Sequence, residues 1–395
     1  VVKAGSAVNA LPVDGTTSSP NTIFGSGSQI GTGNYVVYNS TGNSVTVSGL
    51  TKGLYYYVAI FEFNGPGGPE NYLTSSYATS YQLASSNITA IGGLWSVGAS
   101  WSGGVMPGQS DNAYIPSGVT ITADTITKLV GNIFVDNGGT LLANATNLGT
   151  GPQRILRVYG PNIINNGTIG DANGTDGLRI DIFNAAGTTT ISGSGTTKMA
   201  KLVPGASCPE LKISGNVMVN YQASLTGGGS AFQITSTPAY FTKVTIDAGA
   251  TLSSGPLASI GATSGSADAP FNWTMDVYGN LTCGSSAGQL RLNTLAANTG
   301  RVNVYPTGVV TVGTNLILNS TLGGLITFVV DGTLNLGAAG TADFSNASQT
   351  ITGSGTVTLP SGGTISLGAA TGLSISGPIL TATRTFSTGA NYSYV

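Results

Sequence analysis

The chain has 395 residues, of which 40% are hydrophobic and only 7% are charged, and its formal net charge is −2. Because an average soluble domain carries about 25% charged residues, hydroxyl and amide side chains must solvate most of this surface. The 13 basic residues are scattered along the chain and form no basic stripe, which argues against a nucleic acid partner. No apolar run approaches the roughly 20 residues of a membrane span, so we expect no membrane insertion.

Histidine is absent, and the two cysteines are Cys208 and Cys283. The usual zinc, copper and iron sites therefore lack their ligands, and a Ser/His/Asp triad cannot form. A surface poor in charge and in thiols and rich in Thr, Ser and Gly favours an extracellular location. We predict no redox cofactor and no histidine-based catalysis.

From residue 34 the chain reads NYVVYNSTGNSVTVSGLTKGLYYYVAIFEFNG. Its period-two alternation of apolar and polar residues, interrupted by the polar turn STGN, predicts a meander of antiparallel strands. Tyr56 is placed as in the corner of an immunoglobulin-like sandwich, where a tyrosine early in a strand bonds through its hydroxyl to the preceding loop. Tyr56, Val58 and Ile60 would then face the core.

This stretch, together with LPVDGTT (11–17), FGSGSQIGTGNYVVY (24–38) and EFNGPGGPENYLT (62–74), resembles the fibronectin type III-like modules of very large secreted proteins of Bacteroidota. The resemblance covers about residues 1–84. It implies an immunoglobulin- or fibronectin type III-like β-sandwich that starts after its usual first strand. Such a module is a spacer or display unit, and the resemblance implies no catalytic residue in it.

A second pattern begins after residue 123: an apolar-x-apolar run, a turn with glycine and Asp or Asn, and another alternating run. Turn glycines recur at intervals such as 22 residues (138 to 160) and 34 residues (215 to 249). A period of this size, with strand-type alternation and no helical segment, is typical of a β-helix. We therefore predict an all-β chain in which a right-handed parallel β-helix (β-solenoid) spans residues 123–380. The turn glycines are Gly138, Gly160, Gly193, Gly215, Gly249, Gly279, Gly308, Gly332, Gly355 and Gly377.

The segment between these two patterns, residues 85–122, holds two of the chain's three tryptophans. The open end of a solenoid exposes apolar surface that needs a cover. We predict that Trp95, Trp101, Pro107 and Asp111 form this structural cap. The pattern W-x5-W-x2-G-x2-P-x3-D-x3-I-P-x-G-V resembles the entry segment of β-helix modules in the same Bacteroidota proteins.

Two further expectations follow from this organisation. Residues 381–395, which include TRTFSTGANYSYV, resemble the start of a further module or linker in those proteins. The stacking also places Cys208 and Cys283 about three coils apart, and coils are about 4.8 Å apart. Since a disulfide needs Cα atoms about 4.4–6.8 Å apart, both cysteines should be free thiols.

Charged residues are dense only in the sequence GDANGTDGLRID. Asp171, Asn173 and Asp176 make a candidate calcium site, although the spacing is one residue off the usual calcium loop and the later glutamate is missing. No other cofactor is expected. Arg179 and Asp181 alternate with apolar residues, which predicts an exposed ion pair on the solvent face of a strand.

Three functions stay open. The favoured one is a non-enzymatic segment of a large extracellular bacterial surface protein, an adhesin or structural stalk, because the chain is a nearly uncharged repetitive rod without a catalytic constellation. The resemblance adds export by the type IX secretion system and service in attachment or gliding motility. The partners would be a surface polysaccharide or another extracellular ligand, other modules of the same chain and the secretion machinery.

The two alternatives involve carbohydrate. β-Helices also carry polysaccharide lyases and hydrolases, whose chemistry needs clustered carboxylates or a carboxylate beside a Lys or Arg base. Such an enzyme would have its cleft near Asp171 to Asp181, joined by Arg154 or Arg157. A polysaccharide-binding module would instead present exposed tyrosines in a line on one outer face.

Overall fold

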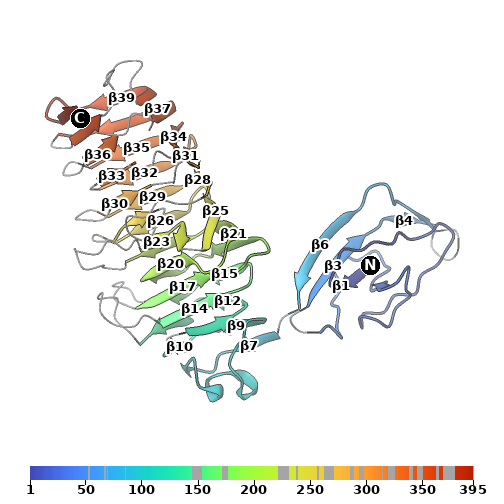
Figure 1. Cartoon of the computed structure of the whole chain (residues 1–395). Helices are drawn as coiled ribbons and strands as arrows, with labels where there is room; N and C mark the ends of the chain where they lie inside the picture. Colours follow the sequence, from blue (N-terminus) through green and yellow to red (C-terminus); the bar gives the residue numbers. More distant parts are fainter. Residues whose placement is uncertain are drawn as a thin grey trace. The chain divides into compact units, whose positions relative to one another are not determined.

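The computed structural model describes residues 1–395 except for 52–53, 66–67, 69, 85, 126, 145–153, 171–176, 221–230, 237–238, 256–257, 262–270, 285–288, 293–297, 314, 319–324, 338–340, 345–349, 362–363, 368–378 and 395. The described residues are all-β apart from two short 3₁₀ turns, η1 (Gly98–Ser100) and η2 (Ser102–Gly104). Neither is long and apolar enough to span a membrane. The chain divides into two compact units, Val1–Ser86 and Asn87–Val395 (Figure 1).

The first unit contains two small antiparallel sheets, which do not establish the predicted fibronectin type III-like sandwich. The predicted meander is wrong in its middle, because residues 43–47 lie outside any strand and β1 instead pairs with β3. One sheet has the order β2-β1-β3-β6 and the other pairs β4 with β5. The strands are β1 (Val2–Ala4), β2 (Asn34–Tyr35), β3 (Tyr55–Ile60), β4 (Phe63–Asn64), β5 (Asn71–Tyr72) and β6 (Ala78–Leu83).

The tyrosine predicted to bond back to its loop does so. The Tyr56 hydroxyl accepts a hydrogen bond from the backbone N–H of Thr51 at 2.8 Å, and the Tyr56 ring packs edge-on against Phe24. Val58 packs against the same small core. Ile60, in contrast, is 62% exposed, so its predicted core position is wrong. It lies beside a cavity of about 420 Å³ that neighbouring side chains leave unfilled.

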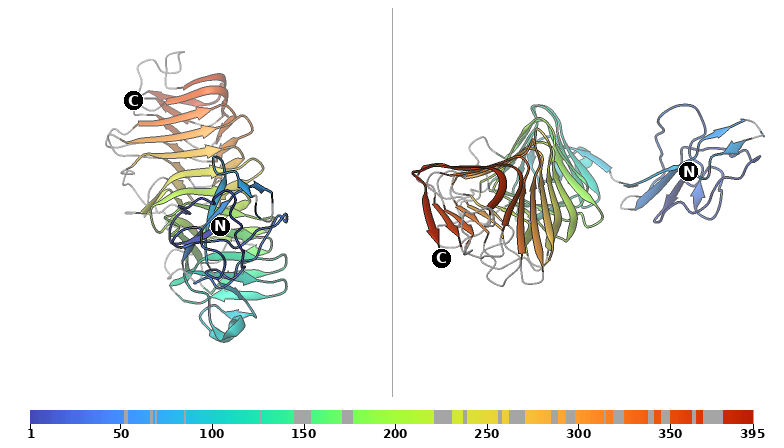
Figure 2. Two further views of the ribbon diagram at one scale, coloured as in Figure 1. Left: turned by 90° about the vertical axis from the view of Figure 1, so that its right-hand side faces the viewer. Right: turned by 90° about the horizontal axis from the view of Figure 1, so that it is seen from above.

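The second unit is a parallel β-solenoid, as predicted, in which each coil adds one strand to each of three faces (Figures 1 and 2). Face A contains β9 (Asp111–Ile115), β12 (Asn132–Val135), β15 (Asn162–Asn165), β18 (Thr188–Ser192), β21 (Cys208–Ile213), β25 (Ala239–Ile246), β28 (Trp273–Val277), β31 (Thr299–Val304) and β34 (Leu325–Val330). Face B contains β10 (Thr120–Ala123), β13 (Thr140–Ala143), β16 (Thr168–Ile169), β19 (Thr196–Met199), β22 (Asn216–Val219), β26 (Thr251–Ser254), β29 (Asn280–Cys283), β32 (Val309–Val312) and β35 (Thr333–Leu336).

The remaining strands complete the coils. Two long strands, β37 (Thr350–Leu359) and β39 (Ile379–Phe386), run along face A and continue into face B, and β24 (Thr235–Ser236) pairs antiparallel with β25. Face C contains β11 (Thr127–Val130), β14 (Arg154–Val158), β17 (Leu178–Ile182), β20 (Lys201–Pro204), β23 (Phe232–Gln233), β27 (Ile260–Gly261), β30 (Gln289–Arg291), β33 (Asn315–Ile317), β36 (Thr341–Phe344), β38 (Thr364–Leu367) and β40 (Asn391–Tyr394).

Alternation along each strand separates the core from the surface. On β28 and β31, for example, Met275, Val277, Val302 and Val304 are buried, while the residues between them point outward. Because side chains of a strand alternate between its two faces, a period of two fills the interior and leaves the other positions for polar residues. One continuous apolar core results, which extends from the two tryptophans of the entry segment to the last coils.

Glycine is required at the corner between faces A and B. The residue directly before most face B strands is glycine, and a Cβ atom there would lie between 2.1 and 2.8 Å from a backbone carbonyl oxygen of the coil before it. The repeated spacing therefore reflects close backbone approach between stacked corners. Gly160 is an exception to the predicted series, since it precedes a face A strand, and Gly377 lies outside the described residues. The corner glycines are Gly139, Gly167, Gly195, Gly215, Gly279, Gly308 and Gly332.

The predicted limits of the solenoid change at both ends. Strands β9 and β10 already pair with β12 and β13, so regular coils begin within the predicted entry segment 85–122. Strands β39 and β40 pair with β37 and β38, so residues 381–394 continue the last coil where a further module or linker was predicted. Period-two alternation is the same in a coil and in a new module, which is why the pattern could not separate them.

Candidate functional site

The tryptophan segment lies over the first coil of the solenoid. Strand β7 (Ser86–Thr89) pairs with β9, and β8 (Gly93–Leu94) pairs with β10. The Trp95 and Trp101 rings are fully buried and meet edge-on, with centroids 4.9 Å apart, and the Trp101 indole N–H donates to the Trp95 carbonyl oxygen. Pro107 is buried, and the buried Asp111 carboxylate accepts from the backbone N–H of Gly108 at 2.9 Å.

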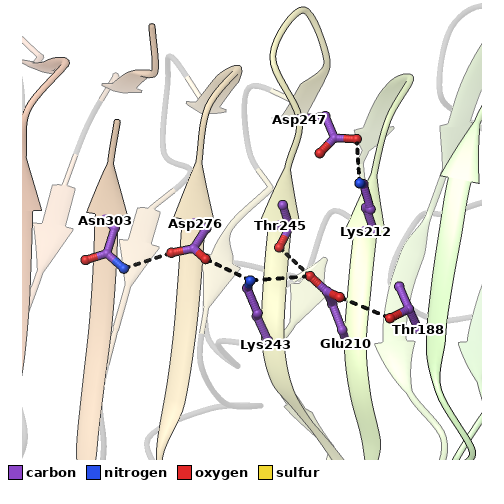
Figure 3. A network of polar contacts seen from close by, with 8 residues as sticks. All are labelled: Thr188, Glu210, Lys212, Lys243, Thr245, Asp247, Asp276 and Asn303. Atoms are coloured by element: carbon purple, nitrogen blue, oxygen red, sulfur yellow. Dashed lines mark hydrogen bonds and ion pairs between the residues drawn. The ribbon is translucent and has the colours of Figure 1, made fainter. Parts of the chain in front are cut away.

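A polar network lies on the outside of face A and crosses five neighbouring strands from β18 to β31 (Figure 3). We call it the face A network: Thr188, Glu210, Lys243, Thr245, Asp276, Arg301 and Asn303. The Lys243 ammonium nitrogen lies 3.7 Å from Glu210 Oε1 and 3.0 Å from Asp276 Oδ2, on the strands to either side. Since like charges on adjacent strands would repel, a cation between two anions favours this register.

Both carboxylates of the face A network are saturated with donors. Glu210 Oε1 accepts from the Thr245 hydroxyl at 2.5 Å and Oε2 from the Thr188 hydroxyl at 3.0 Å. Asp276 Oδ1 accepts from the Asn303 amide at 2.8 Å, and Oδ2 faces Lys243. A carboxyl that has to protonate a leaving group or activate water would first lose one of these partners. The network therefore suits cross-linking of coils better than glycoside hydrolysis.

Acidic residues in the A-to-B turns also bond to neighbouring coils. Asp247 contacts Lys212 at 3.2 Å and accepts from the Ser214 hydroxyl at 2.5 Å. Asp331 accepts from the backbone N–H and hydroxyl of Ser354, which lower its pKa. The sequence had suggested bonds to nearby backbone in the same turn. The partners come instead from an adjacent coil, because stacking brings turn onto turn.

A second charged surface lies on face C. We call it the face C basic group: Arg157 on β14, Arg179 and Asp181 on β17, and Lys201 on β20. Arg157 lies across from Asp181, and Arg179 across from Lys201, in the parallel register of these strands. The predicted ion pair exists, with Arg179 Nε 2.5 Å and Nη2 3.1 Å from the two Asp181 oxygens. It is not fully exposed as predicted, because Asp181 is only 4% accessible.

Burial shifts the pKa values of two members of the face C basic group. It raises the pKa of Asp181 and outweighs the lowering effects of Arg179, Arg157 and Lys201. It also lowers the pKa of Lys201 to about 8, with a further lowering from Arg179. Both shifts disfavour the charged forms, as expected where a strand edge is withdrawn from water.

Aromatic rings lie at the end of two strands of the same group. Tyr159 follows β14 and Phe183 follows β17, and the rings stack with centroids 5.0 Å apart and planes inclined by 27°. The Arg157 guanidinium carbon lies 5.2 Å from the Phe183 centroid, within cation–π range. Two more aromatic stacks, Tyr278–Tyr305 and Tyr240–Phe271, lie at other coils. Tyr278 and Tyr305 follow face A strands, so the described pairs do not share one strand end as the tyrosine-line hypothesis requires.

The remaining sequence-based sites can be placed as follows. The calcium candidates Asp171, Asn173 and Asp176 lie outside the described residues. Within the described part of the chain, no group of three or more Cys, Asp and Glu side chains is arranged to hold a metal ion. Arg154 hydrogen-bonds through Nε to Asn144 on its own coil at 2.6 Å, away from the Arg179–Asp181 pair that it was expected to join.

Sequence reasoning missed the face A network. Glu210, Lys243 and Asp276 are spaced 33 residues apart, since 243 − 210 and 276 − 243 are both 33. A spacing equal to one coil would have placed them side by side. The signal was available, but the uneven glycine intervals gave no reason to choose that length over another.

Comparisons with known proteins give no relative. No family model, no curated protein and no solved structure matches the chain. Function therefore has to be argued from the residues themselves.

Proposed function

We propose that this chain is a non-enzymatic segment of a large extracellular protein of a bacterial cell surface, where it acts as an adhesin or attachment stalk. The observation that carries the proposal is the use of charge in the face A network. All four oxygens of its two carboxylates contact donors on the same or adjacent strands. Ions that join coils in this way favour a structural role over a catalytic one.

The architecture supports the same role. Each coil of a solenoid contacts only its neighbours, so length can grow without a change in the core. The chain has few charged residues, and hydroxyl and amide side chains solvate its surface. In this proposal the solenoid is a right-handed β-helix, and the first unit is a fibronectin type III-like spacer; its Tyr56 bond to the preceding loop supports that assignment.

The proposal includes export and partners. Export by the type IX secretion system, a bacterial source among Bacteroidota and service in attachment or gliding motility rest on the resemblance of residues 1–122 to modules of giant surface proteins. The partners would be other modules of the same chain, the secretion machinery and a surface polysaccharide or another extracellular ligand.

A carbohydrate-active enzyme is the second candidate, and one observation favours it. Arg157 lies across from Asp181, as a cleft near that residue would require, and Lys201 beside them has a pKa of about 8. An amine with a pKa near neutrality can act as a base. Within the face C basic group, however, the one carboxylate is held by Arg179 through both oxygens, which leaves it poorly placed for acid catalysis.

Deletion of the gene tests the stalk proposal. Cells lacking the protein should attach to surfaces less well than the parent strain, and externally added protease should remove the protein from intact parent cells. Attachment that is unchanged by the deletion, or a protein that protease cannot reach, would contradict the proposal.

A further inference from the structure

We propose that the face C basic group, with Tyr159 and Phe183, is a binding site for an acidic polysaccharide. An anionic group of the sugar, carboxylate or sulfate, would pair with Arg157 and Arg179, and a sugar ring would pack on the aromatic pair. This names a ligand for the attachment role proposed above and rests on that role only for its biological purpose.

Charge is the first observation. Among the described residues of this group, three cations on adjacent strands surround one carboxylate. Arg179 holds that carboxylate in a two-point ion pair, and Asp181 is almost wholly buried. In a chain with only 13 basic residues, this arrangement leaves an excess of positive charge at one place on face C, which would attract an anion.

Arg157 is the second observation, and it is independent of the first. Its Nε atom is buried and has no hydrogen-bond partner among the described residues. A buried donor without a partner costs about 1–3 kcal/mol. The ring of Phe183 holds the guanidinium in place, so an oxygen of a bound anion could fill this position without a rearrangement of the side chain.

The aromatic pair is the third observation. Tyr159 and Phe183 are both half-buried and stack on one another next to the arginines. Gly205 lets the Phe183 ring lie close to the backbone, because a Cβ atom on it would lie 2.0 Å from that ring. Rigid aromatic faces beside charged donors suit a sugar, which presents an apolar ring face and polar substituents. Nucleic acid fits less well, since three cations form no stripe along a phosphate backbone.

Binding to immobilised polymers tests the proposal with the full chain. The probes are polygalacturonate and a sulfated polysaccharide, with dextran as the neutral polymer and a single-stranded oligonucleotide as the competing anion. Binding to the two acidic polysaccharides should exceed binding to dextran and to the oligonucleotide by at least about tenfold, and it should weaken as salt rises.

Variants localise the site. Arg157→Gln should weaken binding at least about tenfold, roughly the loss of one charge-assisted hydrogen bond, and Tyr159→Ala should weaken it by a similar factor. Neither substitution breaks the Arg179–Asp181 ion pair, so both variants should keep the far-UV circular dichroism and remain folded at the assay temperature. Arg301→Gln on face A is the matched control and should bind within about twofold of the parent.

Three outcomes would overturn the proposal: no binding of either acidic polymer, equal binding of dextran or oligonucleotide, or equal losses in the Arg301 control. Since binding is measured on the purified chain, its failure would leave the attachment role standing. Unchanged attachment of cells that lack the gene, together with intact binding by the purified chain, would overturn the attachment role and leave the binding site standing.

Discussion

At the scale of single residues, burial and charge act against each other at Lys201. Burial lowers its pKa from 10.5 to about 8. Between these two pH values the unfolded chain holds the proton and the folded chain releases it, so the free energy of unfolding rises with pH across this window. The lysine therefore lowers stability at pH 7, which is tolerated if its charge serves a ligand.

Replacement of Lys201 by methionine tests this interpretation. We expect Lys201→Met to raise Tm at pH 7 by about 1–3 °C and to flatten the rise of stability with pH between about 8 and 10.5 relative to the parent, because the buried charge is gone. Thermal unfolding followed by circular dichroism over that pH range gives both quantities. A Tm below that of the parent at pH 7 would mean that contacts of the ammonium outweigh its burial.

A corner glycine makes the second prediction at this scale. In Gly332→Ala the new Cβ would lie 2.2 Å from the Gly308 carbonyl oxygen, so the corner has to open. We expect a loss of about 2–3 kcal/mol in the free energy of unfolding, measured by urea denaturation.

Gly249→Ala is the matched control for the corner. Gly249 has a positive φ of 80°, and a Cβ added to it would have no atom within 4 Å, so only backbone strain is added there, about 1 kcal/mol. Equal losses in the two variants would show that close approach of the backbones is not the reason for glycine at the corner.

At the scale of elements, cross-strand contacts decide which coils lie side by side. Lys243 is a bridge between Glu210 and Asp276, but its side chain is 42% exposed, and water and salt screen it. We expect Lys243→Met to cost less than about 1 kcal/mol at low salt and almost nothing at about 1 M salt. Lys212→Met, which removes a single ion pair with Asp247, should cost less still. A loss above about 2 kcal/mol that persists in high salt would show that the network does more than align coils.

The cysteines test the number of coils between two strands. Cys208 lies on β21 and Cys283 on β29, and the ladder from β21 through β25 to β28 puts them two coils apart, not three as predicted. Both are buried free thiols, as expected. Burial raises the pKa of Cys208 to about 12 and that of Cys283 further. Neither should react with a thiol reagent at a pH of about 8 in the native protein, and both should react in denaturant; one disulfide found by nonreducing mass analysis would contradict the register.

The sequence predicted the elements better than their partners. Alternation and recurring glycine indicated the solenoid, and the position of Tyr56 indicated its bond to the preceding loop. The pattern did not show that residues 381–394 close the last coil, because alternation only reports which side of a strand is buried. It also could not pair Arg157 with Asp181 or Lys243 with Asp276, since those contacts depend on coil length, which loops of unequal size vary.

At the scale of the whole molecule, charge separates into two uses. On face A, cations and anions alternate from strand to strand and satisfy each other. On face C, three cations share one buried carboxylate among the described residues. A solenoid with one self-neutralised face and one cationic group can hold a partner without a catalytic centre, and this division is the basis for a binding role in place of turnover.

The central claim, that the chain binds without catalysis, is tested most directly by one measurement on the purified protein. A panel of neutral and acidic polysaccharides is incubated with the chain, with and without calcium, and both retention of the protein and release of soluble sugar fragments are followed. We expect retention by acidic polymers and no release of fragments. Fragment release that disappears in the Lys201→Met variant would contradict the claim and establish the enzyme instead.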